Sequence, residues 1–122
     1  MESLALDASA AIALFSEADA HHARAVVEFE AAVERGDAMS MAASAYSEIM
    51  VHALRRRRGD LVDRFVDRLQ IEIIPADRDV ARSAAELRAQ HGALRLPDAL
   101  VAATARVRGA RLLTFDERLA QL

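Results

Sequence analysis

The chain has 122 residues, and 53% of them are apolar, which is enough for a domain with its own hydrophobic core. It contains no cysteine, which excludes disulfides and thiolate metal sites and suits a reducing compartment, so we expect a cytoplasmic protein. All 16 basic residues are arginine, which excludes lysine chemistry such as a P-loop, and the net charge of −3 argues against a general polyanion-binding protein.

Short apolar runs alternate with segments of helical spacing along the whole chain. In chain order, the pattern predicts a strand at 4–6, helices at 8–17 and 21–35, a weak strand at 38–41, helices at 44–57 and 60–70, a strand at 71–75, helices at 78–90 and 97–109, a strand at 111–115 and a short helix from 116. This order predicts an α/β fold, with a central parallel sheet of about four to five strands flanked by helices. Because there is no linker or repeat, we expect residues 1–122 to form a single domain.

Four acidic residues occupy the places where such a sheet binds ligands, at the carboxyl ends of strands and the starts of helices. Asp7 follows the first predicted strand and Asp116 follows the last, while Glu48 and Asp98 lie early in helices. Each acid alone has a structural explanation, either as an N-cap or as a charge that complements a helix dipole. If the four converge beside these apolar segments, however, they repel one another and lose hydration unless a cation compensates.

The ligand chemistry then narrows the kind of cation. Carboxylate oxygens with no cysteine favour a hard ion, which predicts Mg²⁺ or Mn²⁺, with one or two ions bound. Such a site typically orients a phosphate and activates water. With a net charge of −3, we expect the metal to bridge the carboxylates and the phosphates of a nucleic acid.

Four stretches resemble, in order and at the expected length, the motifs of the PIN domain. More narrowly, they are similar to the VapC-type ribonuclease toxins of bacterial toxin–antitoxin pairs. The stretches are Leu-Asp-Ala-Ser-Ala at 6–10, Ser-Glu at 47–48, Pro-Asp-Ala-Leu-Val-Ala-Ala-Thr-Ala at 97–105 and Leu-Leu-Thr-Phe-Asp at 112–116.

The resemblance implies a PIN-like nuclease domain over residues 1–122 that acts as a metal-dependent endoribonuclease. It also implies a cognate antitoxin that blocks the acidic pocket, and a homodimer. Ser9 and Thr114 match small hydroxyl residues that support the acids by hydrogen bonds. Ala8 departs from the family, where serine or threonine is common. The residues that the resemblance makes both catalytic and metal-binding are Asp7, Glu48, Asp98 and Asp116.

Arginines near these acids are candidate RNA contacts. Arg95 lies shortly before Asp98, and Arg118 lies shortly after Asp116. The run 55–58 ends a predicted helix, where solvated cations favour the dipole, and consecutive residues point in different directions. We therefore expect at most one or two of the run, with Arg55 and Arg58 as candidates, to face RNA.

Aromatic and histidine side chains give weaker signals. Tyr46 lies close enough to Glu48 to approach a substrate, although core packing is the simpler role, and no histidine is assigned to catalysis. The four phenylalanines at core spacing are Phe15, Phe29, Phe65 and Phe115. The four histidines, none of which forms an i, i+4 metal pair, are His21, His22, His52 and His91.

Two alternatives belong to other functional classes. A catalytically inactive PIN-like module that binds proteins or regulates them is disfavoured by the four acids, because a protein without a metal has no use for repelling carboxylates. A phosphatase of the haloacid dehalogenase type needs a second aspartate two residues after the first, as well as a lysine. The chain has Ser9 at that position and contains no lysine.

Overall fold

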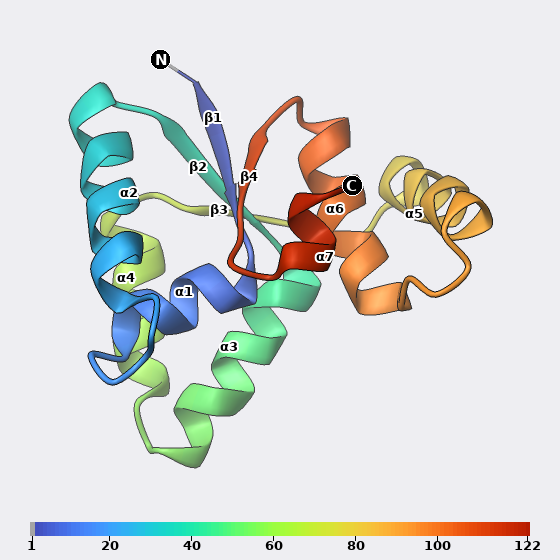
Figure 1. Ribbon diagram of the computed structural model, residues 1–122. Coiled ribbons are helices and arrows are strands. Elements are labelled where there is room, and N and C mark those ends of the chain that lie inside the picture. Colours follow the sequence, from blue (N-terminus) through green and yellow to red (C-terminus); the bar gives the residue numbers. More distant parts are fainter. Residues whose placement is uncertain (1) are drawn as a thin grey trace.

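The structure is a computed structural model that describes residues 2–122, and it has the α/β architecture predicted from the sequence (Figure 1). The described residues form four strands and seven helices. The strands are β1 (Ser3–Leu6), β2 (Ala38–Ala42), β3 (Glu72–Ile74) and β4 (Arg111–Leu113). The helices are α1 (Ala8–Phe15), α2 (His22–Arg35), α3 (Ala43–Arg55), α4 (Gly59–Arg68), α5 (Arg78–Gln90), α6 (Leu96–Val107) and α7 (Glu117–Ala120).

The four strands form one parallel sheet in the order β3-β2-β1-β4. The chain leaves β1 for β2 on one side and returns much later as β4 on the other, so β1 ends at the point where the strand order switches direction. Leu6 is in register with Met41 of β2 and Leu113 of β4. The residues that follow these three therefore emerge at the same height, at the end of the sheet where an α/β protein binds ligands.

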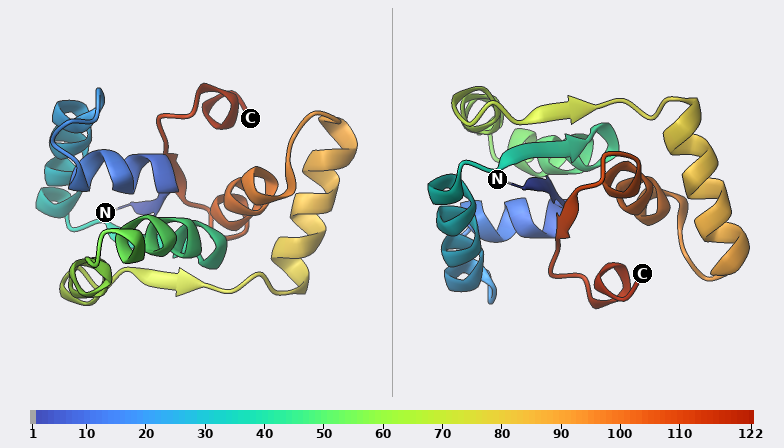
Figure 2. Two further views of the ribbon diagram at one scale, coloured as in Figure 1. Left: turned by 90° about the horizontal axis from the view of Figure 1, so that it is seen from below. Right: turned by 90° about the horizontal axis from the view of Figure 1, so that it is seen from above.

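Helices cover both sides of the sheet, as Figure 2 shows with α2 and α4 on one side and α5 and α6 on the other. The main core joins β1 and β2 to α1 and α3 through buried side chains such as Leu4, Met41 and Ile49. A second core lies where α5 and α7 meet α6, and it includes Val80 and Leu87. Among the described residues, no helix is both long and apolar enough to cross a membrane.

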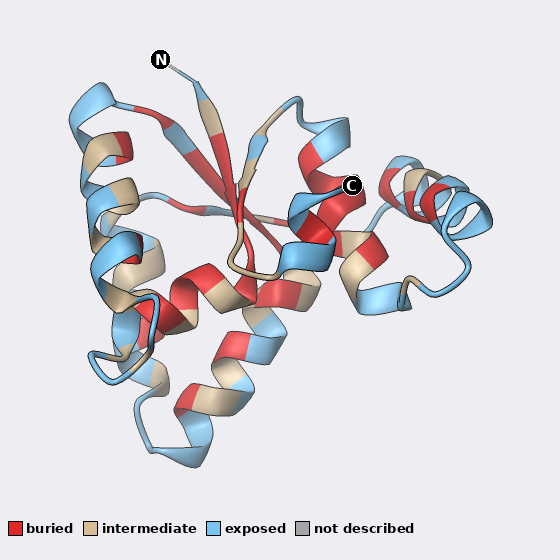
Figure 3. Cartoon of the chain, in the orientation of Figure 1, coloured by how far each residue is buried: buried red, intermediate tan, exposed pale blue. Residues whose placement is uncertain are grey.

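Helix α6 is buried along most of its length (Figure 3). Pro97 occupies its first turn, where the missing N–H has no intrahelical partner in any case. Ala99 and Ala103 are fully buried, and small side chains let the helix approach both the sheet and α5 closely. The sequence of this helix therefore fixes the position of Asp98 in its first turn.

Several predicted boundaries were wrong by a few residues. Helix α1 ends at Phe15, and Phe15 is 41% exposed instead of part of the core. Strand β4 ends at Leu113, because the next residues turn toward β1 to make side-chain hydrogen bonds. Gly59 begins α4 instead of only ending α3: a Cβ there would lie 2.8 Å from Cδ2 of Leu54, so glycine permits the two helices to approach.

Candidate active site

Asp7 is a buried carboxylate at the end of the central strand. Its Oδ1 accepts a hydrogen bond from the Ala8 N–H at 2.7 Å, so it caps α1, as its structural explanation expected. Its Oδ2 accepts two more, from Ser9 Oγ at 2.8 Å and from Thr114 Oγ1 at 2.7 Å. With about two lone pairs on each oxygen, Oδ2 is fully used, whereas Oδ1 has one lone pair left for a further ligand.

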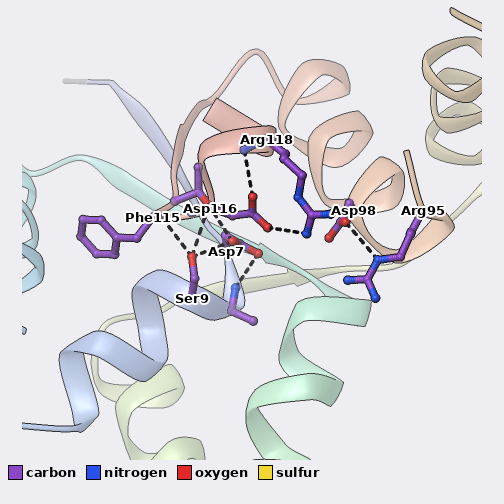
Figure 4. A network of polar contacts seen from close by, with 9 residues as sticks. Asp7, Ser9, Arg95, Asp98, Phe115, Asp116 and Arg118 are labelled. Carbon is purple, nitrogen blue, oxygen red and sulfur yellow. Dashed lines mark hydrogen bonds and ion pairs between the residues drawn. The ribbon is translucent and has the colours of Figure 1, made fainter. Parts of the chain in front are cut away.

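The two hydroxyls also hold the turn that follows β4 (Figure 4). Ser9 Oγ accepts the Phe115 N–H at 3.0 Å, and Thr114 Oγ1 accepts the Asp116 N–H at 3.0 Å. Each hydroxyl therefore donates to Asp7 and accepts from the turn. This network ties Asp116 to Asp7 and fixes the distance between the first and last strand ends.

Asp116 caps the short helix α7, as its structural explanation also expected. Its Oδ1 accepts the Arg118 N–H at 2.9 Å, and its Oδ2 lies 3.5 Å from the Arg118 guanidinium. Partial burial would raise the pKa of Asp116, but the hydrogen bonds and charge of Arg118 outweigh burial and lower it. Asp116 is thus kept ionised by a neighbour in its own segment.

Asp98 has a similar arginine neighbour. The Arg95 Nε lies 3.5 Å from Asp98 Oδ2, and Asp98 is largely buried whereas the Arg95 side chain is exposed. A hollow of about 340 Å³ beside this pair is also lined by Arg118 and His91. The two arginines predicted to touch RNA therefore share one hollow next to the acids.

Glu48 lies on α3, close enough to sense two of the other acids. Burial raises the pKa of Glu48, and the charges of Asp7 and Asp98 raise it further, while Arg95 lowers it. The residue as a whole is nevertheless exposed, so its carboxylate can also reach solvent. We refer to Asp7, Glu48, Asp98 and Asp116 as the carboxylate cluster.

The carboxylate cluster has the donor chemistry that suits a hard divalent cation. All four side chains offer oxygen, and the repulsion felt by Glu48 is what a cation would relieve. Within residues 2–122, however, no three histidine, aspartate or glutamate side chains are grouped closely enough to hold one ion as they stand. Two of the four are instead directed toward Arg95 and Arg118, which a cation would have to replace as partners.

The remaining predicted residues are distributed around the cluster. Arg55 shares a hollow with Glu48, whereas Arg58 lines a different one, between α1 and α4. Tyr46 donates its hydroxyl hydrogen bond to Asp63 and is occupied away from the acids. Phe115, expected in the core, is only partly buried and stacks on His21, a contact that the sequence analysis missed.

Comparison with known proteins agrees with this fold. Residues 4–122 match the PIN domain, so the chain belongs to the PIN domain family. No curated protein sequence matches it.

Among solved structures, a toxin–antitoxin complex from Klebsiella pneumoniae is similar, with a TM-score of 0.75, 24% identity, and coverage of 94% of this chain and 88% of that one. VapC20 from Mycobacterium tuberculosis, a toxin that cleaves the sarcin–ricin loop, has a TM-score of 0.72 and 18% identity, covering 97% and 93%. VapBC2 from Rickettsia felis, bound to a DNA fragment from its promoter, has a TM-score of 0.76 and 16% identity, covering 98% and 92%.

Proposed function

We propose that the protein is a cytoplasmic, metal-dependent endoribonuclease toxin that hydrolyses RNA phosphodiester bonds at the carboxylate cluster and is neutralised by a cognate antitoxin. Residues 1–122 act as one PIN-like nuclease domain. The observation that supports this most directly is the hydrogen-bond network through Ser9 and Thr114, which brings Asp7 and Asp116 together from distant parts of the chain. Asp98 lines a hollow together with Arg118, next to Asp116. Similarity in fold to VapC20 is consistent with RNA as the substrate.

The four acids would hold Mg²⁺ or Mn²⁺, one or two ions, with Asp7 contributing Oδ1 because its Oδ2 is saturated by Ser9 and Thr114. When bound, such an ion supplies a Lewis acid for the phosphodiester and lowers the pKa of water. The chain itself supplies rigid placement of Asp7, so the acid does not have to be ordered when RNA binds. Both hydroxyls keep that carboxylate oriented from outside the ligand shell.

Arg95 and Arg118 would orient the phosphate. Both side chains are about two-thirds exposed, at 67% and 69%, and each guanidinium has five N–H donors, of which the contact with its aspartate uses only part. They can therefore turn toward a phosphodiester that enters the hollow they share. Arg55 lines the same hollow as Glu48, about two helical turns along α3, and would contact the RNA further along, whereas Arg58 lines a different hollow.

Cleavage of RNA by the purified chain tests this function. The protein, free of any partner, is incubated with total RNA in Mg²⁺ or Mn²⁺, and the Asp98→Asn variant is compared with Asp67→Asn, which removes an exposed charge on α4. The cleavage rate of Asp98→Asn should fall by more than roughly 10- to 100-fold, which is the cost of losing a supporting partner, while Asp67→Asn stays active. RNA affinity should also fall when EDTA replaces the metal.

Two outcomes would contradict the proposal. If Asp98→Asn cleaves as fast as the wild type, the carboxylate cluster is not the catalytic site. If the folded wild type cleaves no RNA but binds a protein partner, the alternative of a catalytically inactive PIN-like binding or regulatory module holds. Circular dichroism of both variants separates loss of chemistry from loss of fold.

A groove between α1, α3 and α4 suits the proposed antitoxin. It has a volume of about 450 Å³, an apolar floor that includes Ile12 and Ile49, and exposed apolar walls at Phe15 and Leu61. Arginines at its rim complement an amphipathic segment that carries acidic residues beside its apolar ones. A structure of similar fold from Klebsiella pneumoniae is a toxin–antitoxin complex, which supports this kind of partner.

Co-expression with the product of the adjacent reading frame tests the partner. That product should co-purify with the wild type and protect RNA from it, and Leu61→Glu should abolish both effects. Asp67→Asn, on the same helix, should keep both. If the product still protects RNA from the Leu61→Glu variant, the antitoxin binds outside this groove. The proposed homodimer has only the family resemblance in its support, and sedimentation of the purified chain tests it.

A further inference from the structure

Phe115 and two residues of the α2 start form an aromatic patch next to the carboxylate cluster. The rings of His21 and Phe115 are stacked, with centroids 4.8 Å apart and planes within 6° of parallel. The guanidinium carbon of Arg24 lies 5.5 Å from the Phe115 centroid. Phe115 rests on the main core, whereas His21 and Arg24 are exposed. The patch therefore has a partly buried inner ring, Phe115, and an outer surface that is open to solvent.

The patch is rigidly connected to the acids. Phe115 immediately precedes Asp116, so their Cα atoms are about 3.8 Å apart. The Phe115 N–H donates to Ser9 Oγ at 3.0 Å, and the same hydroxyl donates to Asp7. In Figure 4, the Phe115 ring points away from Asp98 and Arg95. The patch and the arginine hollow thus lie on opposite sides of Asp7.

His21 is also held in place before any ligand binds. The backbone N–H of His21 donates to Asp19 Oδ1 at 2.8 Å. The imidazole Nδ1 of the next residue, His22, lies 2.8 Å from the Ala13 carbonyl oxygen. These contacts attach the start of α2 to α1, and the stack on Phe115 orients the imidazole of His21. A ligand that stacks on it has little side-chain freedom to freeze, so binding loses little affinity to ordering.

Packing on the core explains the position of the Phe115 ring, but it does not explain why an exposed imidazole is stacked on that ring. Unpaired RNA bases stack on the rings of phenylalanine and histidine and on guanidinium planes, and every base offers a flat face. A cation next to the rings adds attraction for the adjacent phosphate. We propose that His21, Phe115 and Arg24 form a nucleobase-stacking site, in which an unpaired base of the RNA extends the Phe115–His21 stack.

This inference rests on the proposed ribonuclease function, and it predicts the path that the RNA strand follows across the site. An RNA strand held by Arg95 and Arg118 on one side of Asp7 crosses the carboxylate cluster and places a base on His21 at the other side. The base belongs to a nucleotide adjacent to the scissile phosphodiester. The substrate must therefore be single-stranded there, because a paired base cannot stack on a side chain.

Binding of fluorescent RNA to the inactive Asp98→Asn chain in Mg²⁺ tests the site without relying on cleavage. Short single-stranded RNAs carry one 2-aminopurine, moved along the sequence, because stacking quenches its fluorescence. One position should be quenched on binding. His21→Ala should abolish that quenching and weaken binding roughly 5- to 150-fold, the range for loss of one base–aromatic stack. His21→Phe should restore both, and the exposed α2 variant Val27→Ala should change neither.

An abasic nucleotide at the quenched position provides a second measurement. If the base stacks on His21, the abasic RNA binds the His21→Ala and parent chains equally, since the contact has already been removed. Arg24→Gln should weaken binding and reduce its dependence on salt. Quenching that survives His21→Ala, or an affinity loss that persists with the abasic RNA, overturns the stacking site while leaving the ribonuclease proposal intact. RNA that fails to bind, together with a wild type that cleaves none, overturns both.

Discussion

The substitution Thr114→Val tests whether a charge-assisted hydrogen bond holds the end of β4 to the end of β1. It keeps the shape and β-branching of the side chain and removes only the hydroxyl, which donates to Asp7 Oδ2 at 2.7 Å and accepts the Asp116 N–H at 3.0 Å. A hydrogen bond to a charged group contributes about 1.5–3 kcal/mol. Asp116 is partly exposed, so water can reach its freed N–H and the extra loss is small. We expect the free energy of unfolding to fall by about 2–3 kcal/mol.

Thr104→Val is the matched control. Thr104 is buried, whereas Thr114 is only partly buried, and the Thr104 hydroxyl donates at a similar distance, 2.7 Å, to the Leu100 carbonyl oxygen. That acceptor is neutral and keeps its backbone partner within α6, so the expected loss is at most about 1 kcal/mol. Urea unfolding followed by circular dichroism in EDTA measures both. With an m value of about 1–3 kcal/mol/M, the Thr114→Val midpoint should fall by roughly 1 M. Equal midpoints for the two variants would refute the reasoning.

Three further predictions concern charge and metal. In EDTA at pH 7, Glu48→Gln should be more stable than the wild type, because burial and the charges of Asp7 and Asp98 raise the pKa of Glu48 and so disfavour its ionised form in the folded protein. The difference in stability should vanish near the ordinary pKa of glutamate, 4.5. Equal thermal midpoints at pH 7 would contradict this prediction. Asp37→Asn should lower the urea midpoint at pH 7, because the Glu2 N–H and the Arg35 guanidinium lower the pKa of Asp37. This stabilisation is complete above the ordinary pKa of 3.8 and is lost as the pH falls through the lowered pKa, so the midpoints of variant and wild type should draw together as the pH falls below 3.8. Mg²⁺ or Mn²⁺ at about 100 times its Kd should stabilise the wild type by about 2.7 kcal/mol and stabilise Asp98→Asn less, as thermal shifts can measure; identical shifts would place the ion elsewhere.

Local signals made much of the fold predictable from the sequence. Helix α5 has the predicted bounds because Asp77 caps it: its side chain accepts a hydrogen bond from the Val80 N–H at 3.0 Å. Helix α2 stops where expected because Gly36 adopts the left-handed conformation, with φ of 72°. Such features depend on neighbours in the chain, so a single sequence contains them. The predicted end of β4 was wrong because the Phe115 N–H donates a hydrogen bond to the hydroxyl of Ser9, which is distant in the sequence.

The candidate site, like the fold, was predictable from the sequence only in part. The positions of Asp7 and Asp116 follow from strand ends, and the sequence places them at the correct end of the sheet. The orientation of their side chains does not follow, because it depends on which partner each carboxylate meets. Asp98 and Asp116 could each reach an arginine nearby in sequence, and the structure pairs both of them in that way. The His21–Phe115 stack joins two residues whose local patterns indicate only a helix start and a core position.

The bridge of hydroxyls between Ser9, Asp7 and Thr114 also affects when activity can arise during synthesis. Asp7 leaves the ribosome early, but the hydroxyl that completes its shell and the acid that joins it come from the last part of the described chain. A nascent chain that stops before Arg111 lacks β4, one of the two strands that pair with β1, and it also lacks the turn that carries Asp116. Such a fragment cannot assemble the carboxylate cluster. Under the proposed function, nuclease activity therefore cannot arise until the residues up to Asp116 have been made.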